Sequence, residues 1–245
     1  MDRLIYTAMT GAKHTLEQQA TTSHNLANAT TTGFRAQIDQ FRAVPVQGAI
    51  LPTRTFVVDS TTGSDFGSGA IQHTGRELDV AVQGEGWLVV EANGSEAYTR
   101  NGSLKMDENG LLLTRDGLTV QGDSGPISIP PGSNLVVAKD GTISMLPEGS
   151  QPNGLTTVGR LKLVNPPATD LVRSDDGLFR MKSGEPATAD PNVSLISGAL
   201  ESSNVNVVDA MVDMISLARQ FDMQIKLLER AESNDSKASQ LLAAN

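Results

Sequence analysis

The sequence predicts an α+β protein in which one helix at each end of the chain flanks a central all-β region. Near both termini, apolar residues recur at alternating steps of four and three, the spacing of a helix that buries one stripe against another helix. In the centre, short apolar runs alternate with glycine, proline and Asx-Gly pairs, a pattern typical of antiparallel sheets. We therefore expect a coiled-coil-like pair of terminal helices, a β-rich domain built as a sandwich or barrel, and an extended linker.

The N-terminal helix is predicted over residues 1–28, because the four-three repeat is regular there and no proline interrupts it. Gln19 and Ser23 occupy two positions of the repeat and make it less apolar. Gly33 offers the left-handed conformation that often follows a helix end. The apolar members of this predicted seam are Ile5, Met9, Ala12, Leu16 and Leu26.

Residues 36–75 are expected to form the extended linker. The helical period is lost there, and Pro45, Pro52 and several glycines separate short apolar pieces. Such a composition is typical of a segment that lies along other surfaces and does not build a core of its own.

A β-rich domain is predicted over residues 76–202, with about ten short strands and no segment of helical length between them. The absence of intervening helices argues against a parallel βαβ arrangement. The predicted strands include Leu78–Val82, Trp87–Val90, Leu104–Met106, Leu111–Leu113, Ile127–Ile129, Leu135–Ala138, Thr142–Met145, Val158–Val164 and Leu178–Met181.

Four Asx-Gly pairs are expected to mark turns of this domain. The Asn109-Gly110 pair lies between two apolar runs, and such a pair favours a tight hairpin because both turn positions take positive φ. The same argument applies to the Asp-Gly pairs at 116–117, 140–141 and 176–177.

The C-terminal helix is predicted from Asn206, a capping residue, to Leu242. An unbroken helix of this length would span about 55 Å, which the shorter N-terminal helix cannot cover completely. We therefore expect residues 1–35 and 203–245 to form a terminal helical domain whose seams are shared with neighbouring subunits. The seam residues of the second helix are Val207, Met211, Met214, Ala218, Phe221, Ile225 and Leu228.

Composition excludes several classes of partner. The formal charge of −9, without any cluster of basic residues, argues against nucleic-acid binding. No apolar run approaches the length of a membrane span, and no cleavable signal peptide is recognisable at the N-terminus. The chain contains no cysteine, which excludes disulfides and thiolate metal sites.

No motif predicts catalysis, so we expect neither an enzyme nor a cofactor. His14, His24 and His73 are the three histidines, and none belongs to a zinc-binding motif. The segment 107–110 resembles half of a calcium loop but lacks the other ligands, which favours a hairpin turn. The two Gly-x-Gly pairs of the sequence lack the third glycine and the following helix of a dinucleotide-binding loop, and no phosphate-binding P-loop motif is present.

One stretch resembles a known family. Residues 23–36, SHNLANATTTGFRA, are similar to the N-terminal signature of the flagellar axial proteins, the rod and hook subunits of bacteria. The blocks LDVAVQGEGWLVVE (78–91), YTRNGSLKMDENGLLLTRDGLTVQG (98–122), LVRSDDGLF (171–179) and GALESSNVNVVDAMVDMI (198–215) are similar to further blocks of that family. The signature positions are Asn25, Leu26, Ala27, Asn28, Thr32, Gly33, Phe34, Arg35, Asn204 and Asn206.

The resemblance implies a structural subunit, and the start MDRLIYTAMTGA with FRAVPVQGA (41–49) favours the proximal-rod members. It implies export through the flagellar export apparatus without a cleaved signal peptide, and a place in the periplasmic rod of the basal body. The implied partners are further copies of the chain and other proximal and distal rod proteins. Terminal helices would line an inner tube of a hollow axle, with the β domain outside it.

Two alternatives stay open at this point. A distal-rod or hook subunit of the same family would share most of the motifs. A secreted β-rich binding module or adhesin, oligomerised by its terminal helices, would have ordered ends in the isolated chain, whereas an axial subunit should have mobile ends before it meets its neighbours.

Overall fold

The structure, a computed structural model, describes residues 2–45, 55–130, 133–147 and 156–243. It divides into two compact units that are described separately below. The helical unit consists of Met1–Ala29, Ala36–Asp65 and Val205–Asn245, and the β unit consists of Thr30–Arg35 and Phe66–Asn204. The predicted α+β class, with terminal helices and a central β-rich region, is confirmed.

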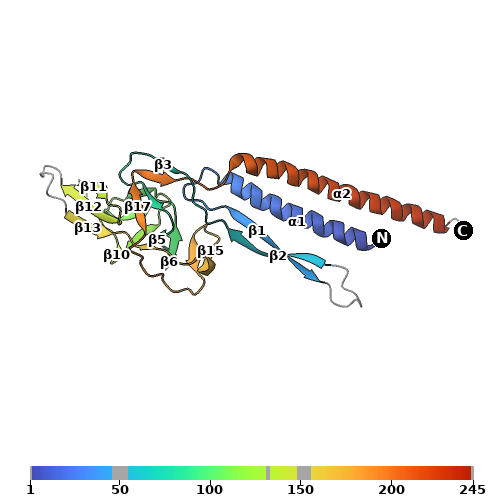
Figure 1. Ribbon diagram of the computed structural model, residues 1–245, viewed down its shortest axis with the longest axis horizontal. Helices are drawn as coiled ribbons and strands as arrows, with labels where there is room; N and C mark the ends of the chain where they lie inside the picture. The colour runs from blue at the N-terminus through green and yellow to red at the C-terminus, as the bar shows by residue number, and fades with distance from the viewer. Residues whose placement is uncertain (1, 46–54, 131–132, 148–155, 244–245) are drawn as a thin grey trace. The chain divides into compact units, whose positions relative to one another are not determined.

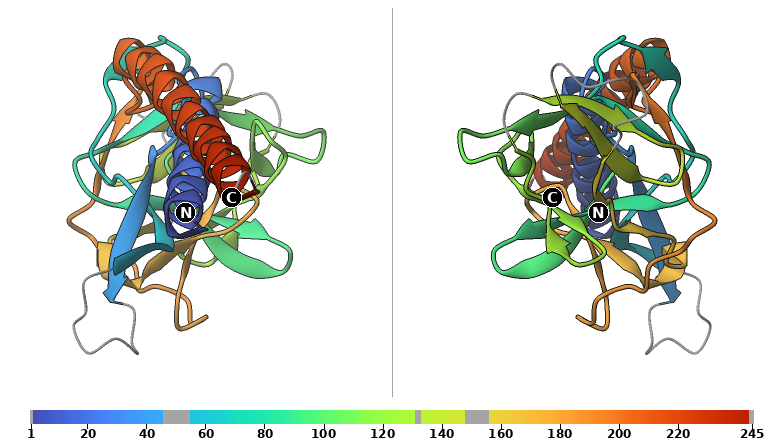
Figure 2. Two further views of the ribbon diagram at one scale, coloured as in Figure 1. Left: turned by 90° about the vertical axis from the view of Figure 1, so that its right-hand side faces the viewer. Right: turned by 90° about the vertical axis from the view of Figure 1, so that its left-hand side faces the viewer.

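The helical unit contains helices α1 (Asp2–Ala27) and α2 (Val207–Ala243), which lie side by side and antiparallel (Figures 1 and 2). Asn206 caps α2 as expected, because its Oδ1 accepts hydrogen bonds from the amides of Val208 (3.0 Å) and Asp209 (3.4 Å). These bonds satisfy amides that have no partner within the helix.

Small side chains line the contact between the two helices. Ala8, Ala12 and Thr15 are buried on α1, and Ala210 and Ala231 are buried on α2. Small residues let helix backbones approach closely. A Cβ placed on Gly11 of α1 would lie 3.1 Å from Nε2 of Gln224 on α2, so these two residues mark one level along the pair.

The extended linker predicted over residues 36–75 is not confirmed. Strand β1 (Gln37–Pro45) pairs antiparallel with β2 (Thr55–Ser64) as a hairpin of the helical unit, while residues 46–54 between them lie outside the described part. Asn25 of α1 holds the start of β1, because its side chain donates to the Gln37 carbonyl and accepts from the Gln37 amide, both at 2.8 Å. Strands with paired backbone groups therefore stand where the proline and glycine content predicted an extended linker.

The β unit is built from antiparallel sheets. The largest sheet has the strand order β15-β16-β6-β5-β9-β8-β7, with β10 beside β9 and β14 beside β5. A three-stranded sheet has the order β11-β12-β13, and two smaller pairs are β17-β4 and β18-β3. The strands are β3 (Ile71–His73), β4 (Val80–Gln83), β5 (Trp87–Ala92), β6 (Ser95–Thr99), β7 (Leu104–Met106), β8 (Leu112–Thr114), β9 (Thr119–Gly122), β10 (Gly125–Pro126), β11 (Ser133–Val137), β12 (Thr142–Pro147), β13 (Thr156–Arg160), β14 (Leu163–Val164), β15 (Leu171–Arg173), β16 (Phe179–Met181), β17 (Ser194–Ser197) and β18 (Ala199–Glu201).

The barrel considered from the sequence is not observed, because within the described residues the largest sheet ends at β15 on one side and β7 on the other. Two predicted strands also differ. Ile127–Ile129 contributes only a bridge between Ser128 and Leu111, and Val158–Val164 is divided between β13 and β14.

Strand β5 is buried on both faces and separates two apolar cores. Leu88 and Val90 belong to the larger core, whereas Trp87 and Val89 belong to a smaller core with Tyr98. Alternate side chains of a strand point to opposite faces. Burial on both faces therefore explains why this strand reads as a continuous apolar run and not as an alternating one.

All four predicted Asx-Gly turns connect paired strands, although their geometry differs from the expected one. Among the described residues, Asn93 is the one non-glycine residue with positive φ, so Asn109 does not adopt the predicted conformation. Instead, Asp107 Oδ1 accepts from the amides of Asn109 (2.9 Å) and Leu111 (2.7 Å). The two-residue turn with both φ values positive lies at Asn93-Gly94, between β5 and β6.

Candidate assembly site

The signature segment Thr30–Arg35 packs within the β unit and not with the helices that precede it. Gly33 has φ +68°, and a Cβ at this position would lie 2.3 Å from the carbonyl carbon of Arg100. The Gly33 amide donates to the carbonyl of Glu201 at 2.8 Å. Glycine is therefore required here both by backbone conformation and by space.

A buried ion cluster fixes the end of this segment. Arg35 Nη1 lies 2.8 Å from Glu201 Oε1, and Arg100 Nη1 lies 3.0 Å from Glu201 Oε2. The exposed fractions of the three side chains are 0% for Arg35, 1% for Glu201 and 3% for Arg100. One carboxylate therefore joins the signature segment, strand β18 and the loop after β6.

Backbone groups complete the cluster. Glu201 Oε1 also accepts from the Gly69 amide at 2.9 Å, and Arg35 Nη1 donates to the Gly67 carbonyl at 2.7 Å. Arg100 Nη2 donates to the Gly84 carbonyl at 2.7 Å. These bonds stabilise charges that would be costly to bury alone.

Two positive charges share the single carboxylate, and Trp87 lies against both of them. The guanidinium carbons of Arg35 and Arg100 lie 6.0 and 5.3 Å from the centroid of the Trp87 ring, a geometry in which the ring face attracts a cation. Among the described residues, no hydrogen-bond partner is found for Nε of either arginine or for Nη2 of Arg35. Burial lowers the pKa of Arg100, although the neighbouring Glu201 opposes that shift.

The remaining signature residues have local structural roles. Asn28 Nδ2 donates to the His24 carbonyl at 2.9 Å and so binds the end of α1. Arg173 lies over the Phe34 ring at 4.5 Å. Asn204 Nδ2 donates to the Gly67 carbonyl at 3.1 Å. Leu26 and Thr32 are half-buried, and Ala27 is exposed.

Sequence patterns did not single out Glu201 or Arg100, although both contact the signature. Each lies inside a block quoted for the family resemblance, Arg100 in YTRNGS and Glu201 in GALESSN. A buried charge can be recognised only when its partners are known, and these partners are more than 60 residues apart in sequence.

The predicted helix seams follow one edge of the contact between α1 and α2. Ala12 is buried, and Ile5, Leu26, Met214, Phe221 and Leu228 are half-buried. The other members are exposed, including Met9 at 61% and Met211 at 50%. The exposed members, which we call the apolar strip, are Met9, Leu16, Val207, Met211, Ala218 and Ile225.

The apolar strip extends over both helices. Gly11 and Gln224 lie at one level, and the helices are antiparallel, so Met9 lies at about the level of Ile225 and Leu16 at about the level of Ala218. On each helix these residues lie on the same flank of the buried line, about 70–130° from it at 100° per residue. Antiparallel helices turn in opposite senses when viewed from one end, so both flanks open to the same side.

One histidine in the described residues contacts a carboxylate. Glu17 follows His14 by three residues, and its Oε2 lies 3.0 Å from His14 Nδ1. The search for zinc-binding motifs in the sequence did not find this pair. No group of three or more His, Asp or Glu residues in the described ranges is arranged to hold a metal ion. Neither described helix is apolar enough over sufficient length to cross a membrane.

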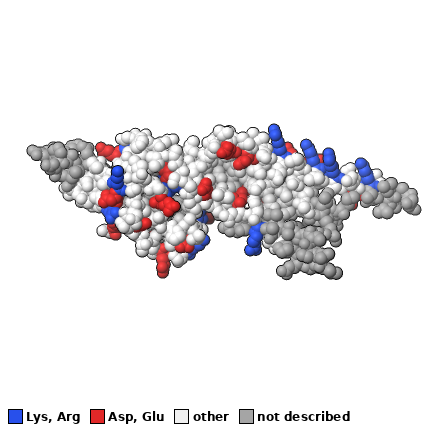
Figure 3. Space-filling view, viewed as in Figure 1, with Lys and Arg blue, Asp and Glu red and all other residues white. Residues whose placement is uncertain are grey.

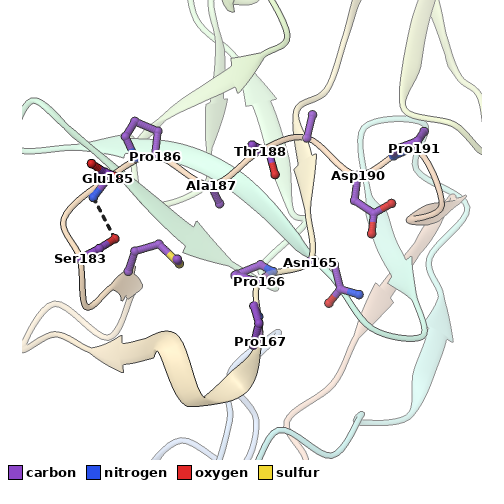
Figure 4. A pocket seen from close by; sticks show the side chains of 12 residues that line it. Asn165, Pro166, Pro167, Ser183, Glu185, Pro186, Ala187, Thr188, Asp190 and Pro191 are labelled. Carbon is purple, nitrogen blue, oxygen red and sulfur yellow. Dashed lines mark hydrogen bonds between the residues drawn. The ribbon is translucent and has the colours of Figure 1, made fainter.

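One hollow of about 400 Å³ lies in the β unit (Figure 4). Its wall contains Pro166, Pro167, Pro186 and Pro191, and its carboxylates are Glu185 and Asp190. The Asp190 carboxylate accepts two hydrogen bonds from Asn192, at 2.9 Å each. Among the described residues, no histidine, lysine or arginine lines the hollow.

Comparison with known proteins identifies three matching families along the chain. Residues 5–35 match the family described as flagella basal body rod protein. Residues 81–145 match the flagellar hook protein FlgE/F/G D1 domain. Residues 196–241 match the flagellar basal body rod FlgEFG protein C-terminal family.

Individual relatives match over nearly the whole chain. The flagellar basal-body rod protein FlgF of Escherichia coli (strain K12) is 51% identical over 250 residues, covering 99% of each chain. FlgF of Buchnera aphidicola subsp. Schizaphis graminum is 33% identical over 251 residues, covering 100% of each chain. The rod protein FlgG of the same organism is 30% identical, covering 89% of this chain and 92% of its own.

The ion cluster yields a first prediction. Replacing Glu201 by Gln leaves two buried arginines without their counter-charge, so the free energy of unfolding of the β unit should fall by about 3–5 kcal/mol. Urea unfolding followed by Trp87 fluorescence measures this change. Glu108→Gln, at an exposed loop position, is the control and should stay within about 0.5 kcal/mol of the unsubstituted chain. A Glu201→Gln chain as stable as this control would contradict the role assigned to the cluster.

Gly33 yields a second prediction with a matched control. Gly184 has φ +73° and, among the described residues, no neighbouring atom within 4 Å of an added Cβ, whereas Gly33 has φ +68° and a close backbone neighbour. Gly184→Ala should therefore cost only the conformational strain of about 1–2 kcal/mol. Gly33→Ala should cost clearly more, measured by the same urea unfolding. Equal losses would show that the Arg100 backbone can move away without cost.

Proposed function

Because the chain belongs to the flagellar basal-body rod protein family, we propose that it is a structural subunit of the proximal rod in the bacterial flagellar basal body. The supporting observation is the 51% identity to a FlgF rod protein over 99% of both chains. The match to a FlgG rod protein is weaker, at 30% over 89% of this chain. This difference favours the proximal-rod proposal over another axial position.

The chain would act by association, through the apolar strip. Met9, Leu16, Met211 and Ile225 are large apolar side chains that are between 36% and 61% exposed on the helical unit. Burying such a side chain completely gains about 1.5–3 kcal/mol relative to exposure. Contiguous exposed apolar surface commonly marks a protein interaction site. We infer that helices of neighbouring subunits cover this strip in a coiled-coil-like arrangement.

The helical unit would form the inner tube of the rod, and the β unit its outer layer. The ion cluster supports this division of roles, because Arg35 is held inside the β unit within the described structure. The chain segment that leaves α1 is thereby fixed by the β unit before any neighbour binds. The proposed partners are further copies of the chain and other proximal and distal rod proteins.

The proposal places the subunit in the periplasmic rod, delivered by the flagellar export apparatus without a cleaved signal peptide. A chain without cysteine suits such a route, because no thiol can be oxidised after export. A secreted binding module or adhesin has no comparable support, since the matched families are rod and hook proteins.

The proposed function predicts that a charge in the apolar strip blocks assembly. Ile225→Asp should leave the β unit folded, because Ile225 belongs to the helical unit and is 36% exposed. In cells lacking their own copy of the gene, the variant should reduce swimming in soft agar by at least about tenfold, as expected for a charge in an apolar contact. The unsubstituted chain should restore swimming and be present in purified basal bodies.

Asn234→Asp introduces the same charge at an exposed α2 position outside the strip and should swim normally. Normal swimming of Ile225→Asp would show that the strip is not an assembly surface. Failure of the unsubstituted chain to enter basal bodies would refute the rod function itself.

A further inference from the structure

A row of basic side chains follows the face of α2 that points away from α1. Figure 3 shows lysine and arginine side chains projecting along this helix. Arg219 lies nine residues after the buried Ala210, which places it on the opposite side of the helix at 100° per residue. The row consists of Arg219, Lys226, Arg230 and Lys237, spaced at seven, four and seven residues.

The four basic side chains are exposed, and none of them forms an ion pair within the described part of the chain. The carboxylates of Asp209 and Asp213, in the first turns of the same helix, are also exposed and have no cation within ion-pair distance there. The chain has a net charge of −9, so a row of basic side chains that form no ion pair is unusual in it. These side chains can bind acidic groups of another molecule.

The spacing of the two charge sets is complementary. Asp209 and Asp213 are four residues apart, and so are Lys226 and Arg230. Residues four apart lie on one side of a helix, about 6 Å apart along its axis. Seventeen residues at 100° per residue put the acidic pair and the basic pair on sides of α2 that are about 100° apart. A second parallel helix displaced by 17 residues, about 25 Å, and turned about its axis so that its acidic side faces the basic row, would bring both acidic residues beside both basic residues at once.

We propose that α2 of one copy contacts α2 of a second copy in this way, with Lys226 and Arg230 receiving the partner's acidic pair. The inference rests on the proposed rod function, which requires contacts between different patches so that growth can continue. Two parallel helices in register would place Asp209 and Asp213 beside the same residues of the partner, and Lys226 beside Lys226, so like charges would repel each other. The charges therefore set the axial displacement between copies, while apolar burial supplies most of the affinity.

A shallow groove lies beside the same row and fits this arrangement. Val212, Ile215, Ser216, Arg219, Gln220 and Met223 line it. Val212, Ile215 and Met223 are more than half exposed, so the outer face of α2 offers apolar contact area next to its basic side chains. Electrostatic matching at the edge of an apolar contact is a common source of specificity.

Cysteine cross-linking tests the displacement directly, because the chain has no cysteine of its own. We expect the pair Asp213→Cys with Arg230→Cys to give cross-linked dimers of this chain in purified basal bodies after mild oxidation. The pair Asp213→Cys with Lys226→Cys is the control, because it is matched in an antiparallel, closed dimer. In the proposed arrangement these two positions are offset by one turn, about 6 Å along the axis, so they should cross-link much less than the 213–230 pair. Gln220→Cys alone would cross-link to itself in that dimer or in a parallel pair in register, and not at the proposed displacement.

Charge exchange tests whether the pairs matter for assembly. Lys226→Glu with Arg230→Glu, and separately Asp209→Lys with Asp213→Lys, should each lower the yield of basal bodies by about tenfold. The chain carrying all four changes should recover to within about twofold, because the pairs are restored with opposite signs. Simple loss of helix stability could not be recovered in this way.

The outcomes separate this inference from the proposed function. An unsubstituted chain that enters basal bodies, together with cross-linking of the antiparallel control and not of the 213–230 pair, would overturn the displacement alone. Charge variants that assemble normally would overturn it as well. Absence of the unsubstituted chain from basal bodies would instead refute the rod function.

Discussion

The ion pairs of the Glu201 carboxylate are the interactions that fix the signature segment within the β unit. The carboxylate binds Arg35 and Arg100 at 2.8 and 3.0 Å and is almost completely buried. Such a cluster contributes little to stability compared with an apolar core, because desolvation cancels most of the attraction. Its effect is positional, because Arg35 binds the same carboxylate as Arg100 and also donates to the Gly67 carbonyl. The segment between α1 and β1 is therefore fixed in one place.

The two units bury their apolar surface to different degrees. The β unit has two well-buried cores on either side of β5. The helical unit buries mainly alanines and one threonine at its helix contact and leaves large apolar residues such as Met9 and Met211 exposed. A protein that functioned alone would gain by reversing this pattern, with large residues inside and small ones outside. The arrangement is consistent with helices that complete their packing in an assembly.

Local patterns predicted many elements because their causes are local. Asn206 caps α2, and all four Asx-Gly turns connect paired strands. Turn geometry was predicted less well, since Asp107 binds two nearby amides and Asn109 keeps a negative φ. The hairpin over 37–64 was missed because pairing of β1 with β2 depends on contacts with α1, such as that of Asn25 with Gln37, which no local window contains. The assembly seams stay a prediction, since several of their members, such as Met9 and Met211, are exposed in the described chain.

The sequence by itself determined the class of the fold, the period of both helices, the positions of the turns and the resemblance of both termini to one family. These follow from spacing, capping and backbone conformation, which act over a few residues. Only the tertiary structure decided that residues 30–35 belong to the β unit and that Arg35, Arg100 and Glu201 meet. It also decided which flank of each helix stays exposed. Burial and ion pairing join residues far apart in the chain, so their partners become visible only when the chain is folded.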